Sequence, residues 1–224
     1  MATYFGTNGP DRYTGTATGD TIYGYDGDDI LEGRDGSDYI DGGAGNDMIV
    51  DNDGQTPDLY VDTLLGGDGN DSIWAGYGDN ADGGNGTDNL VFFLNYAPSA
   101  VNIDFTGIWA GGSATIGGGL IQHFEVLWAA YGTAFNDIMI TGTPLGMHSE
   151  LIGNAGNDTL TGGAGTDYLT GGASFGLSIG ADTGYDQLYG LGGDDILSCG
   201  VGDYVDGGAG IDTLNFDVSN YGSG

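Results

Sequence analysis

The sequence has almost no positive charge, and this scarcity excludes whole classes of partner. Arg12 and Arg34 are the only arginines and lysine is absent, against 33 acidic residues, and the formal net charge is −31. Such a charge repels nucleic acid and anionic lipid surfaces, so we expect no nucleic-acid partner. A phosphate-binding loop of the Walker type is excluded as well, because it needs a lysine. Multivalent cations remain the natural partners.

Three further features are missing. Cys199 is the single cysteine, so no internal disulfide can form. No apolar run approaches the roughly 20 residues that span a membrane, so we expect no membrane insertion. The N-terminal stretch lacks the basic region and the apolar segment of a cleavable signal peptide, so export would need another route.

The usual catalytic motifs are also missing. The sequence contains neither HExxH nor GxSxG, and His123 and His148 have no cysteine or histidine partner nearby. Paired carboxylates could serve a glycosidase, but the repeat described next explains them through a metal ion. We therefore expect a protein that is not an enzyme and that has no catalytic residues.

Aspartate and glycine are abundant, and both follow a repeat of nine residues. The acids are almost all aspartate, because only Glu32, Glu125 and Glu150 are glutamates. Five copies follow one another without a break from residue 6 to residue 50, and the last of them reads GGAGNDMIV. Further copies, some altered or one residue short, occupy 57–65, 66–74, 75–82, 83–91, 132–140, 153–161, 162–170, 181–189, 190–198, 199–206 and 207–215.

Two places of the repeat keep their chemistry. Place eight is large and apolar in every copy except the one that carries Ala81. Place six is aspartate in all of them: Asp11, Asp20, Asp29, Asp38, Asp47, Asp62, Asp71, Asp79, Asp88, Asp137, Asp158, Asp167, Asp186, Asp195, Asp203 and Asp212. More than half of the aspartates share this register, which a merely solvated acidic face does not explain.

The repeat predicts a short strand followed by a tight turn. Places seven to nine are mostly β-branched, aromatic or leucine and suit a strand whose central residue points inward. Glycines at places one, two and four suit a turn with positive φ. Two copies form one coil, and stacked coils would place Asp29 over Asp47 and Asp195 over Asp212. Facing carboxylates repel unless a cation lies between them, and carboxylate plus carbonyl oxygen selects calcium.

The phrases GGAGNDMIV (42–50) and GGDGNDSIW (66–74) resemble the RTX, or haemolysin-type calcium-binding, repeat GGxGxDxUx. The resemblance implies an all-β fold, a right-handed parallel β-roll or solenoid with Ca²⁺ between stacked turns. It implies multiple calcium ions, held by turn carbonyls and by the place-six aspartates named above. Copies depart from the pattern where Thr18, Tyr60 and Phe135 replace the place-four glycine.

The repeats also divide the chain. Gly33–Val50 matches Gly153–Thr170 at an offset of 120, which is typical of a tandem duplication. We expect a first RTX array at 1–91, metal-poor β-helical linker coils at 92–131 and a second RTX array at 132–224. Within the linker, the phrases VNIDF and FEVLW predict strands.

The resemblance further implies an exported bacterial protein, secreted or at the cell surface, that leaves by type I secretion and folds on binding extracellular calcium. Its role would be structural, as a spacer, adhesin segment or surface-layer component. Self-association and attached catalytic or adhesive domains are compatible with this role. The alternative is an accessory folding and secretion module of a larger secreted enzyme, such as a protease, lipase or epimerase. An ice- or carbohydrate-binding solenoid is a more remote alternative, because the repeated threonine stripe it would need is missing.

Aromatic residues and the cysteine receive simpler interpretations. Trp74, Trp109 and Trp128 are expected in the core or as caps. Tyrosines at places seven and nine are expected to face outward as strand formers, with a sugar- or partner-binding stripe as the alternative. Cys199 stands at place one of its copy and is expected to be a small turn residue.

Overall fold

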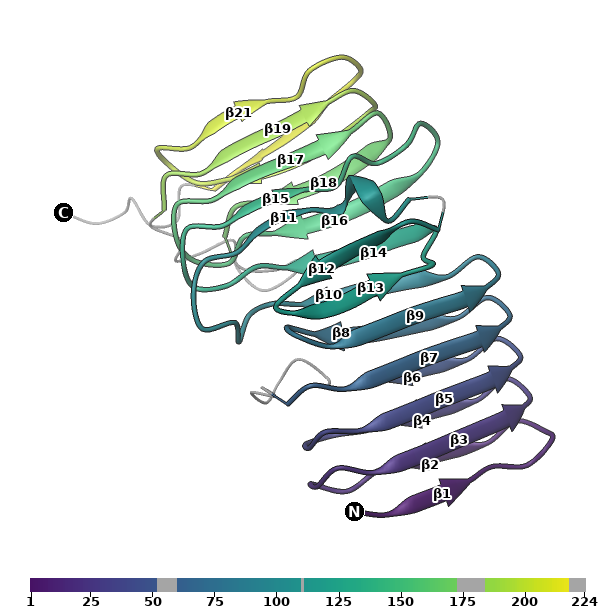
Figure 1. Cartoon of the computed structure of the whole chain (residues 1–224). Coiled ribbons are helices and arrows are strands. Elements are labelled where there is room, and N and C mark those ends of the chain that lie inside the picture. The colour runs from purple at the N-terminus through teal and green to yellow at the C-terminus, as the bar shows by residue number, and fades with distance from the viewer. Residues whose placement is uncertain (52–59, 110, 173–183, 218–224) are drawn as a thin grey trace. The chain divides into compact units, whose positions relative to one another are not determined.

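The computed structural model describes residues 1–51, 60–109, 111–172 and 184–217, and these residues are all-β apart from one short 3-10 helix, η1 (Phe105–Gly107) (Figure 1). The chain divides into two compact units. Unit 1 comprises Met1–Tyr96 and Gly107–Val126, and unit 2 comprises Ala97–Thr106 and Leu127–Gly224. No helix among the described residues is long and apolar enough to span a membrane.

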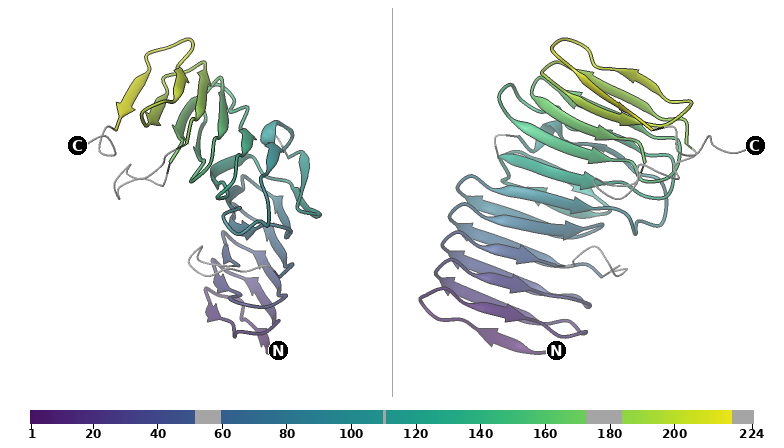
Figure 2. Two further views of the ribbon diagram at one scale, coloured as in Figure 1. Left: turned by 90° about the vertical axis from the view of Figure 1, so that its left-hand side faces the viewer. Right: turned by 180° about the vertical axis from the view of Figure 1, so that it is seen from behind.

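Unit 1 winds back and forth between two sheets, so that each coil contributes one strand to each (Figure 2). One sheet has the order β1 (Thr3–Phe5), β3 (Thr21–Asp26), β5 (Tyr39–Ala44), β7 (Thr63–Asp68), β9 (Asn80–Asn85), β13 (Gly119–Gln122) and β12 (Ser113–Ile116). The other has the order β2 (Arg12–Thr14), β4 (Ile30–Glu32), β6 (Met48–Val50), β8 (Ser72–Gly76) and β10 (Asn89–Phe93). All pairs in these sheets are parallel except β12 with β13.

Unit 2 repeats the same winding. One sheet has the order β11 (Asn102–Asp104), β15 (Ile138–Ile140), β17 (Thr159–Gly163), β19 (Gln187–Leu191) and β21 (Tyr204–Asp206). The other has the order β14 (Val126–Tyr131), β16 (His148–Ile152), β18 (Thr166–Thr170), β20 (Ile196–Cys199) and β22 (Thr213–Phe216). Every pair within these two sheets is parallel.

The core of each unit is a row of place-eight side chains. The three-residue strands β4 and β6 bury only their central residue, Leu31 and Ile49, as the repeat predicts. Since successive side chains of a strand alternate between its faces, the flanking places seven and nine point outward. Further place-eight residues that are at most 1% exposed are Ile22, Ile40, Leu64, Ile73, Ala81, Leu90, Met139, Leu160, Leu169, Leu188 and Leu197. Fully burying one Leu or Ile stabilises a fold by about 1.5–3 kcal/mol.

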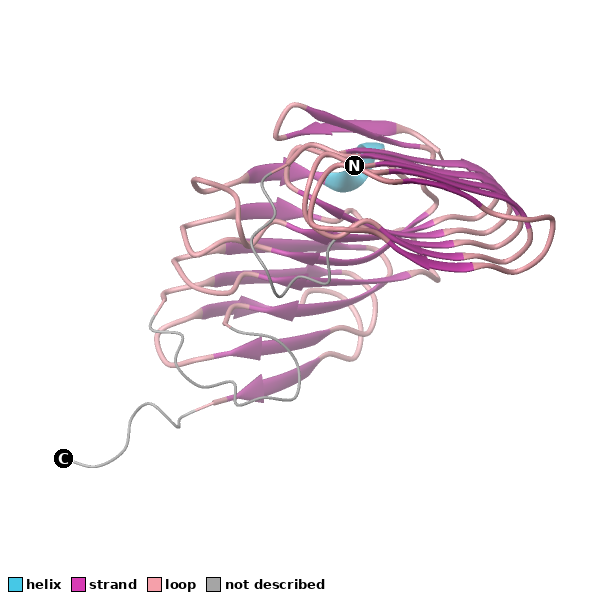
Figure 3. Ribbon diagram, turned by 90° about the horizontal axis from the view of Figure 1, so that it is seen from below, coloured by secondary structure: helices cyan, strands magenta, loops and turns pink. Residues whose placement is uncertain are grey.

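The predicted fold class, an all-β parallel β-roll, is confirmed, and the strands of one sheet are longer than the repeat predicts. β3 and β5 continue through Asp26 and Ala44, so the turn residues of one coil still pair with those of the next. Seen from below, the strands of unit 1 overlie one another coil upon coil (Figure 3). The extension matters because it holds the turns of neighbouring coils at hydrogen-bonding distance.

The segment 92–131 differs from a plain coil. Its phrases VNIDF and FEVLW do contain strands, β11 and the start of β14, but an antiparallel hairpin, β12–β13, lies between them. The turn Gly117–Gly118 has positive φ at both residues, which is the geometry that closes such a hairpin. Cys199 is the last residue of β20 and is buried, so its assignment to a turn was wrong.

Candidate metal sites in the turns

Place-six aspartates begin the strands and are linked from coil to coil by hydrogen bonds. The backbone N–H of Asp29 donates to Oδ1 of Asp47 at 2.8 Å, and the N–H groups of Asp47 and Asp71 donate in the same way to Asp71 and Asp88, each at 2.8 Å. The Asp195 N–H donates to Oδ1 of Asp212 at 3.1 Å. The predicted stacking of Asp29 with Asp47 and of Asp195 with Asp212 is therefore confirmed.

These hydrogen bonds arrange all sixteen predicted residues in four columns, two in each unit. The columns are Asp20–Asp38–Asp62–Asp79 and Asp11–Asp29–Asp47–Asp71–Asp88 in unit 1, and Asp137–Asp158–Asp186–Asp203 and Asp167–Asp195–Asp212 in unit 2. Thirteen of the sixteen are buried. The three that are not, Asp11, Asp203 and Asp212, stand at column ends.

In six turns the second carboxylate oxygen is already satisfied by the turn itself. The place-two N–H of Thr16 donates to Oδ2 of Asp20 at 2.7 Å, and that of Gly163 donates to Oδ2 of Asp167 at 2.7 Å. We call these closed turns. Their aspartates are Asp11, Asp20, Asp79, Asp137, Asp167 and Asp203. In these turns Oδ2 already accepts a backbone N–H, although the carboxylate retains further lone pairs.

Eight of the other turns adopt a different backbone at place two, and we call them open turns; the place-two residues of the Asp62 and Asp186 copies lie outside the described residues. Their place-two residue lies in the left-handed region, with φ between 71° and 113°: Tyr25, Arg34, Gly43, Gly67, Gly84, Asn154, Leu191 and Gly208. No place-two N–H donates to Oδ2 in these described turns. As a result, the buried Oδ2 atoms of Asp29, Asp47, Asp71, Asp88 and Asp195 have no hydrogen-bond partner among the described residues. A buried polar atom of this kind is costly unless a ligand satisfies it.

Glycine at place one leaves room beside each orphaned oxygen. A Cβ atom on Gly42 would overlap Oδ2 of Asp47 and lie 2.7 Å from the carbonyl oxygen of Gly66 in the next coil. The same overlap with carboxylate and carbonyl oxygen occurs at Gly24, Gly66 and Gly190. A carboxylate oxygen and a carbonyl oxygen of successive coils therefore converge at each of these glycines. The donor set is all oxygen, which is the set that calcium prefers.

Burial makes the charged form of these carboxylates unfavourable in the absence of a cation. Desolvation, reinforced by the neighbouring charges of Asp71, Asp29 and Asp28, raises the pKa of Asp47 to about 7. Desolvation and the charge of Asp88 raise the pKa of Asp71 to about 6. Burial also raises the pKa of Asp29, Asp88 and Asp195. A bound divalent cation reverses this balance, because it is the largest local charge and favours ionised ligands.

Two functional residues lie outside the repeat pattern. Asp51 is 2% exposed, and among the described residues its carboxylate lies with those of Asp38 and Asp62, with one oxygen of each within 4.8 Å of the others. It directly follows β6, where a further copy would begin and where most copies have glycine. An aspartate at a glycine place was the signal in the sequence, but the altered spelling of 51–56 concealed it. Glu125 ends a column, since its Oε2 accepts the N–H of Asp88 at 2.9 Å.

Strain at open turns gives a testable prediction about Leu191. Its side chain is 54% exposed and its φ is 71°, a conformation that costs a non-glycine residue about 1–2 kcal/mol. Leu191→Gly should relieve this strain, but glycine loses more chain entropy on folding than leucine does. We therefore expect a net gain of about 0.5–1 kcal/mol in the stability of the calcium-loaded protein. Urea unfolding measures the change. Thr16→Gly is the matched control, because Thr16 stands at place two without positive φ. It should lower the midpoint, and an equal effect of both substitutions would contradict the assignment of strain.

Comparison with known proteins agrees with this geometry. The family model of the RTX calcium-binding nonapeptide repeat (4 copies) matches residues 5–40, 14–49, 58–90, 150–174, 181–204 and 202–214, which together exceed half of the chain. No curated protein matches the chain. Repeats of this family bind Ca²⁺, and the buried oxygens of the open turns fit that ion. The chain therefore belongs to the RTX calcium-binding nonapeptide repeat family, and it is a calcium-binding parallel β-roll.

Proposed function

We propose that this β-roll is a non-catalytic, structural part of an exported bacterial protein and that it folds when it meets extracellular calcium. The observation that supports this most is the set of buried Oδ2 atoms of Asp29, Asp47, Asp71, Asp88 and Asp195, which have no donor within the described residues. Calcium ions would satisfy these oxygens and separate the facing carboxylates. Metal binding and folding would then be one event, because the site exists only when two coils are stacked.

The proposal also ranks the sixteen aspartates. We propose that the ten aspartates outside the closed turns hold calcium: Asp29, Asp38, Asp47, Asp62, Asp71, Asp88, Asp158, Asp186, Asp195 and Asp212. Asp51 would add a third carboxylate to the turn of Asp38 and Asp62. The six aspartates of closed turns would instead brace the backbone. The linker 92–131 would hold no ion, since it contains no place-six aspartate.

Free calcium outside a cell favours this mechanism. Extracellular calcium modules bind with dissociation constants of about 10⁻⁴–10⁻³ M. At millimolar free calcium, which is about 1–10 times these constants, each site adds roughly 0.4–1.4 kcal/mol of stability. Inside a cell the ion is scarce, and the chain would remain unfolded and suited to transport. Type I secretion is the route that we propose on this basis.

A structural role, as a spacer, adhesin segment or surface-layer component, is distinguished from an accessory role by size. We expect the calcium-loaded chain either to remain a compact monomer or to assemble, as measured by light scattering after gel filtration in calcium and in chelator. Ordered assembly in calcium would favour a surface layer. A compact monomer would be compatible with a spacer or with a module of a larger secreted enzyme. The sequences encoded beside the repeats would distinguish these two roles.

Protons should compete with calcium at the open turns. The pKa values of Asp47 and Asp71 in the folded chain, about 7 and about 6, lie above the ordinary value of 3.8. The folded state then binds more protons than the unfolded state. Protonation of these two carboxyl groups therefore stabilises the folded chain fully when the pH is below their ordinary pKa of 3.8. This stabilisation is lost as the pH rises through about 6–7.

Two results are expected from this pH dependence of stability. The chelated protein should gain β structure when the pH is lowered from about 8 to about 5, and its calcium affinity should fall over the same range. Circular dichroism and calcium titration at each pH measure the two effects. A calcium affinity that stays constant across this range would show that the raised carboxyl groups are not the ligands.

A further inference from the structure

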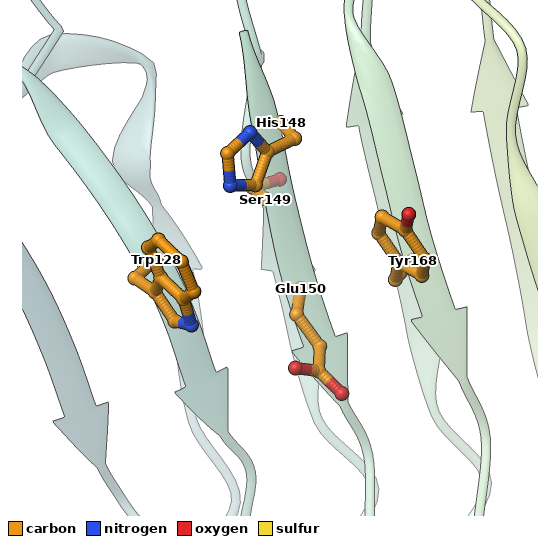
Figure 4. A pocket seen from close by; sticks show the side chains of 5 residues that line it. All are labelled: Trp128, His148, Ser149, Glu150 and Tyr168. Carbon is orange, nitrogen blue, oxygen red and sulfur yellow. The ribbon is translucent and has the colours of Figure 1, made fainter. Parts of the chain in front are cut away.

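A hollow of about 280 Å³ lies on one sheet of unit 2, and it is lined by Trp128, His148, Ser149, Glu150 and Tyr168 (Figure 4). The residues come from three neighbouring strands, β14, β16 and β18. Tyr168 stands at place seven of its copy, but the repeat pattern does not account for Trp128, His148 or Glu150. Three aromatic rings and one carboxylate in a shared hollow are typical of a small-ligand site.

Trp128 was expected in the core or as a cap, and this expectation was wrong. Its side chain is 53% exposed on β14. The ring of His148 meets it edge-on, with ring centroids 5.2 Å apart and planes at 79°. Figure 4 shows Trp128 and Tyr168 on either side of β16, with Glu150 between them. Adjacent strands are about 4.8 Å apart, so β14 and β18, which carry the two outer rings, are separated by about 9.6 Å.

Glu150 is the charged group of this hollow. Its carboxylate is half-buried, and among the described residues no hydrogen bond or ion pair holds it. Burial raises the pKa of this carboxyl group. Its neighbour Ser149 points to the other side of β16, where its hydroxyl donates to Oδ1 of Asp167 at 2.6 Å. This bond and the pairing with β18 fix the strand that carries Glu150 and His148.

Glu150 has no arginine or lysine partner in its own unit, and the only titratable nitrogens lining the hollow are those of His148. The only arginines, Arg12 and Arg34, belong to unit 1, and the chain has no lysine. An anionic ligand would meet only negative charge here. A neutral sugar could donate its hydroxyl groups to Glu150 and stack on a ring, but it would leave the half-buried negative charge without a counter-charge. A cation meets aromatic faces and a carboxylate together, which is the combination that stabilises organic ammonium groups.

We propose that this hollow binds an organic ammonium group, with Trp128 and Tyr168 facing the cation and Glu150 as its counter-charge. The net charge of the chain would raise the local concentration of such a ligand. The site lies on the outer face of a sheet and does not depend on which aspartates hold calcium.

Choline and tetramethylammonium are the probes for this site. Isothermal titration calorimetry with the full chain in calcium should show saturable binding of both. We expect Trp128→Ala and Glu150→Gln each to weaken binding roughly tenfold. Trp74→Ala and Glu32→Gln are matched controls in unit 1 and should leave the affinity unchanged. Circular dichroism checks that every variant is folded, and Trp128→Phe, which retains a ring, should lose less affinity than Trp128→Ala.

Three outcomes would overturn the proposal. The neutral analogue of choline, in which carbon replaces nitrogen, should not compete, and equal binding would show a merely apolar hollow. Saturable binding of methyl glucoside that is lost in Trp128→Ala would assign the hollow to sugars. Unchanged choline affinity in both site variants would remove the site altogether.

The source of the ammonium group can be separated in the same way. Phosphatidylcholine vesicles should not co-sediment with the protein, because the lipid phosphate is repelled by the acidic surface. If the vesicles do co-sediment, and if Trp128→Ala abolishes this, the site binds an ammonium group that belongs to a lipid headgroup. If the fold proves independent of calcium, the proposed function fails while this binding test keeps its outcome.

Discussion

Removal of calcium is expected to unfold the whole chain. In a chelator at neutral pH, the far-ultraviolet circular dichroism should lose its β signal, and the hydrodynamic radius should increase toward that of an unfolded chain. Millimolar calcium should restore both. The transition should be cooperative along each column, because the aspartate of one coil is hydrogen-bonded to that of the next.

Electrostatics makes this effect large. Along one column the carboxylates of Asp29, Asp47, Asp71 and Asp88 are all at most 2% exposed and follow one another coil after coil. Typical domains are stable by only about 5–15 kcal/mol. The ten proposed calcium sites, each worth roughly 0.4–1.4 kcal/mol at millimolar free calcium, would together supply an amount of this size. Glycine adds to the cost of folding without metal, since 49 glycines lose more chain entropy than other residues would.

The control is magnesium at the same concentration. Magnesium requires a small octahedral site and retains its waters, so it should restore little structure. An identical β signal in chelator and in calcium would contradict the coupling of folding to calcium. Full recovery with magnesium would instead show that general charge screening suffices.

Replacement of Asp71 by asparagine should have opposite effects with and without calcium. Asp71→Asn keeps the oxygen that accepts the Asp47 N–H, and it removes a buried charge whose other oxygen, Oδ2, has no partner among the described residues. Without calcium, we expect the variant to be more stable than the parent by an amount on the order of 1–3 kcal/mol. With calcium, it should be less stable by a similar amount, because one site loses a charged ligand.

Asp137→Asn is the matched control for this sign reversal. Asp137 is equally buried, but it belongs to a closed turn, where it accepts the N–H of Val101 at 2.8 Å and the N–H and hydroxyl of Thr133. Asparagine has only one oxygen and must lose part of this set, which costs about 1–3 kcal/mol. The loss should appear both with and without calcium. Urea unfolding in an osmolyte such as sucrose keeps the chelated proteins folded for the comparison. Parallel behaviour of the two variants would refute the division into open and closed turns.

Much of the fold was predictable because one register specifies both strand and turn. The period of nine fixed which residue enters the core, and Leu31 and Ile49 are buried for that reason. The spacing of eighteen residues also predicted that Asp29 faces Asp47. By contrast, the hairpin β12–β13 lies in a segment without repeats, where short apolar runs do not distinguish a coil from a hairpin.

The sequence pattern does not predict which aspartates lie in open turns and which lie in closed turns. Gly43 and Gly163 both stand at place two, yet only Gly43 adopts positive φ, and only Gly163 donates to its aspartate. Glycine permits either conformation, so the residue type does not reveal which oxygen remains available. Leu191 and Tyr25 adopt the left-handed conformation without being glycine, which no propensity predicts. Asp51 was missed because it stands where the repeat requires a glycine.

The hydrogen bonds between aspartates run in one sense, and this makes the roll vectorial. In every column the N–H of an earlier coil donates to the carboxylate of a later one. A chain shortened at its C-terminal side would end on backbone donors, which water satisfies readily. A chain shortened at its N-terminal side would end on carboxylates that have lost their backbone N–H donors. Grafts that lengthen the roll should therefore respect this polarity, with each added coil presenting acceptors to the coil that precedes it.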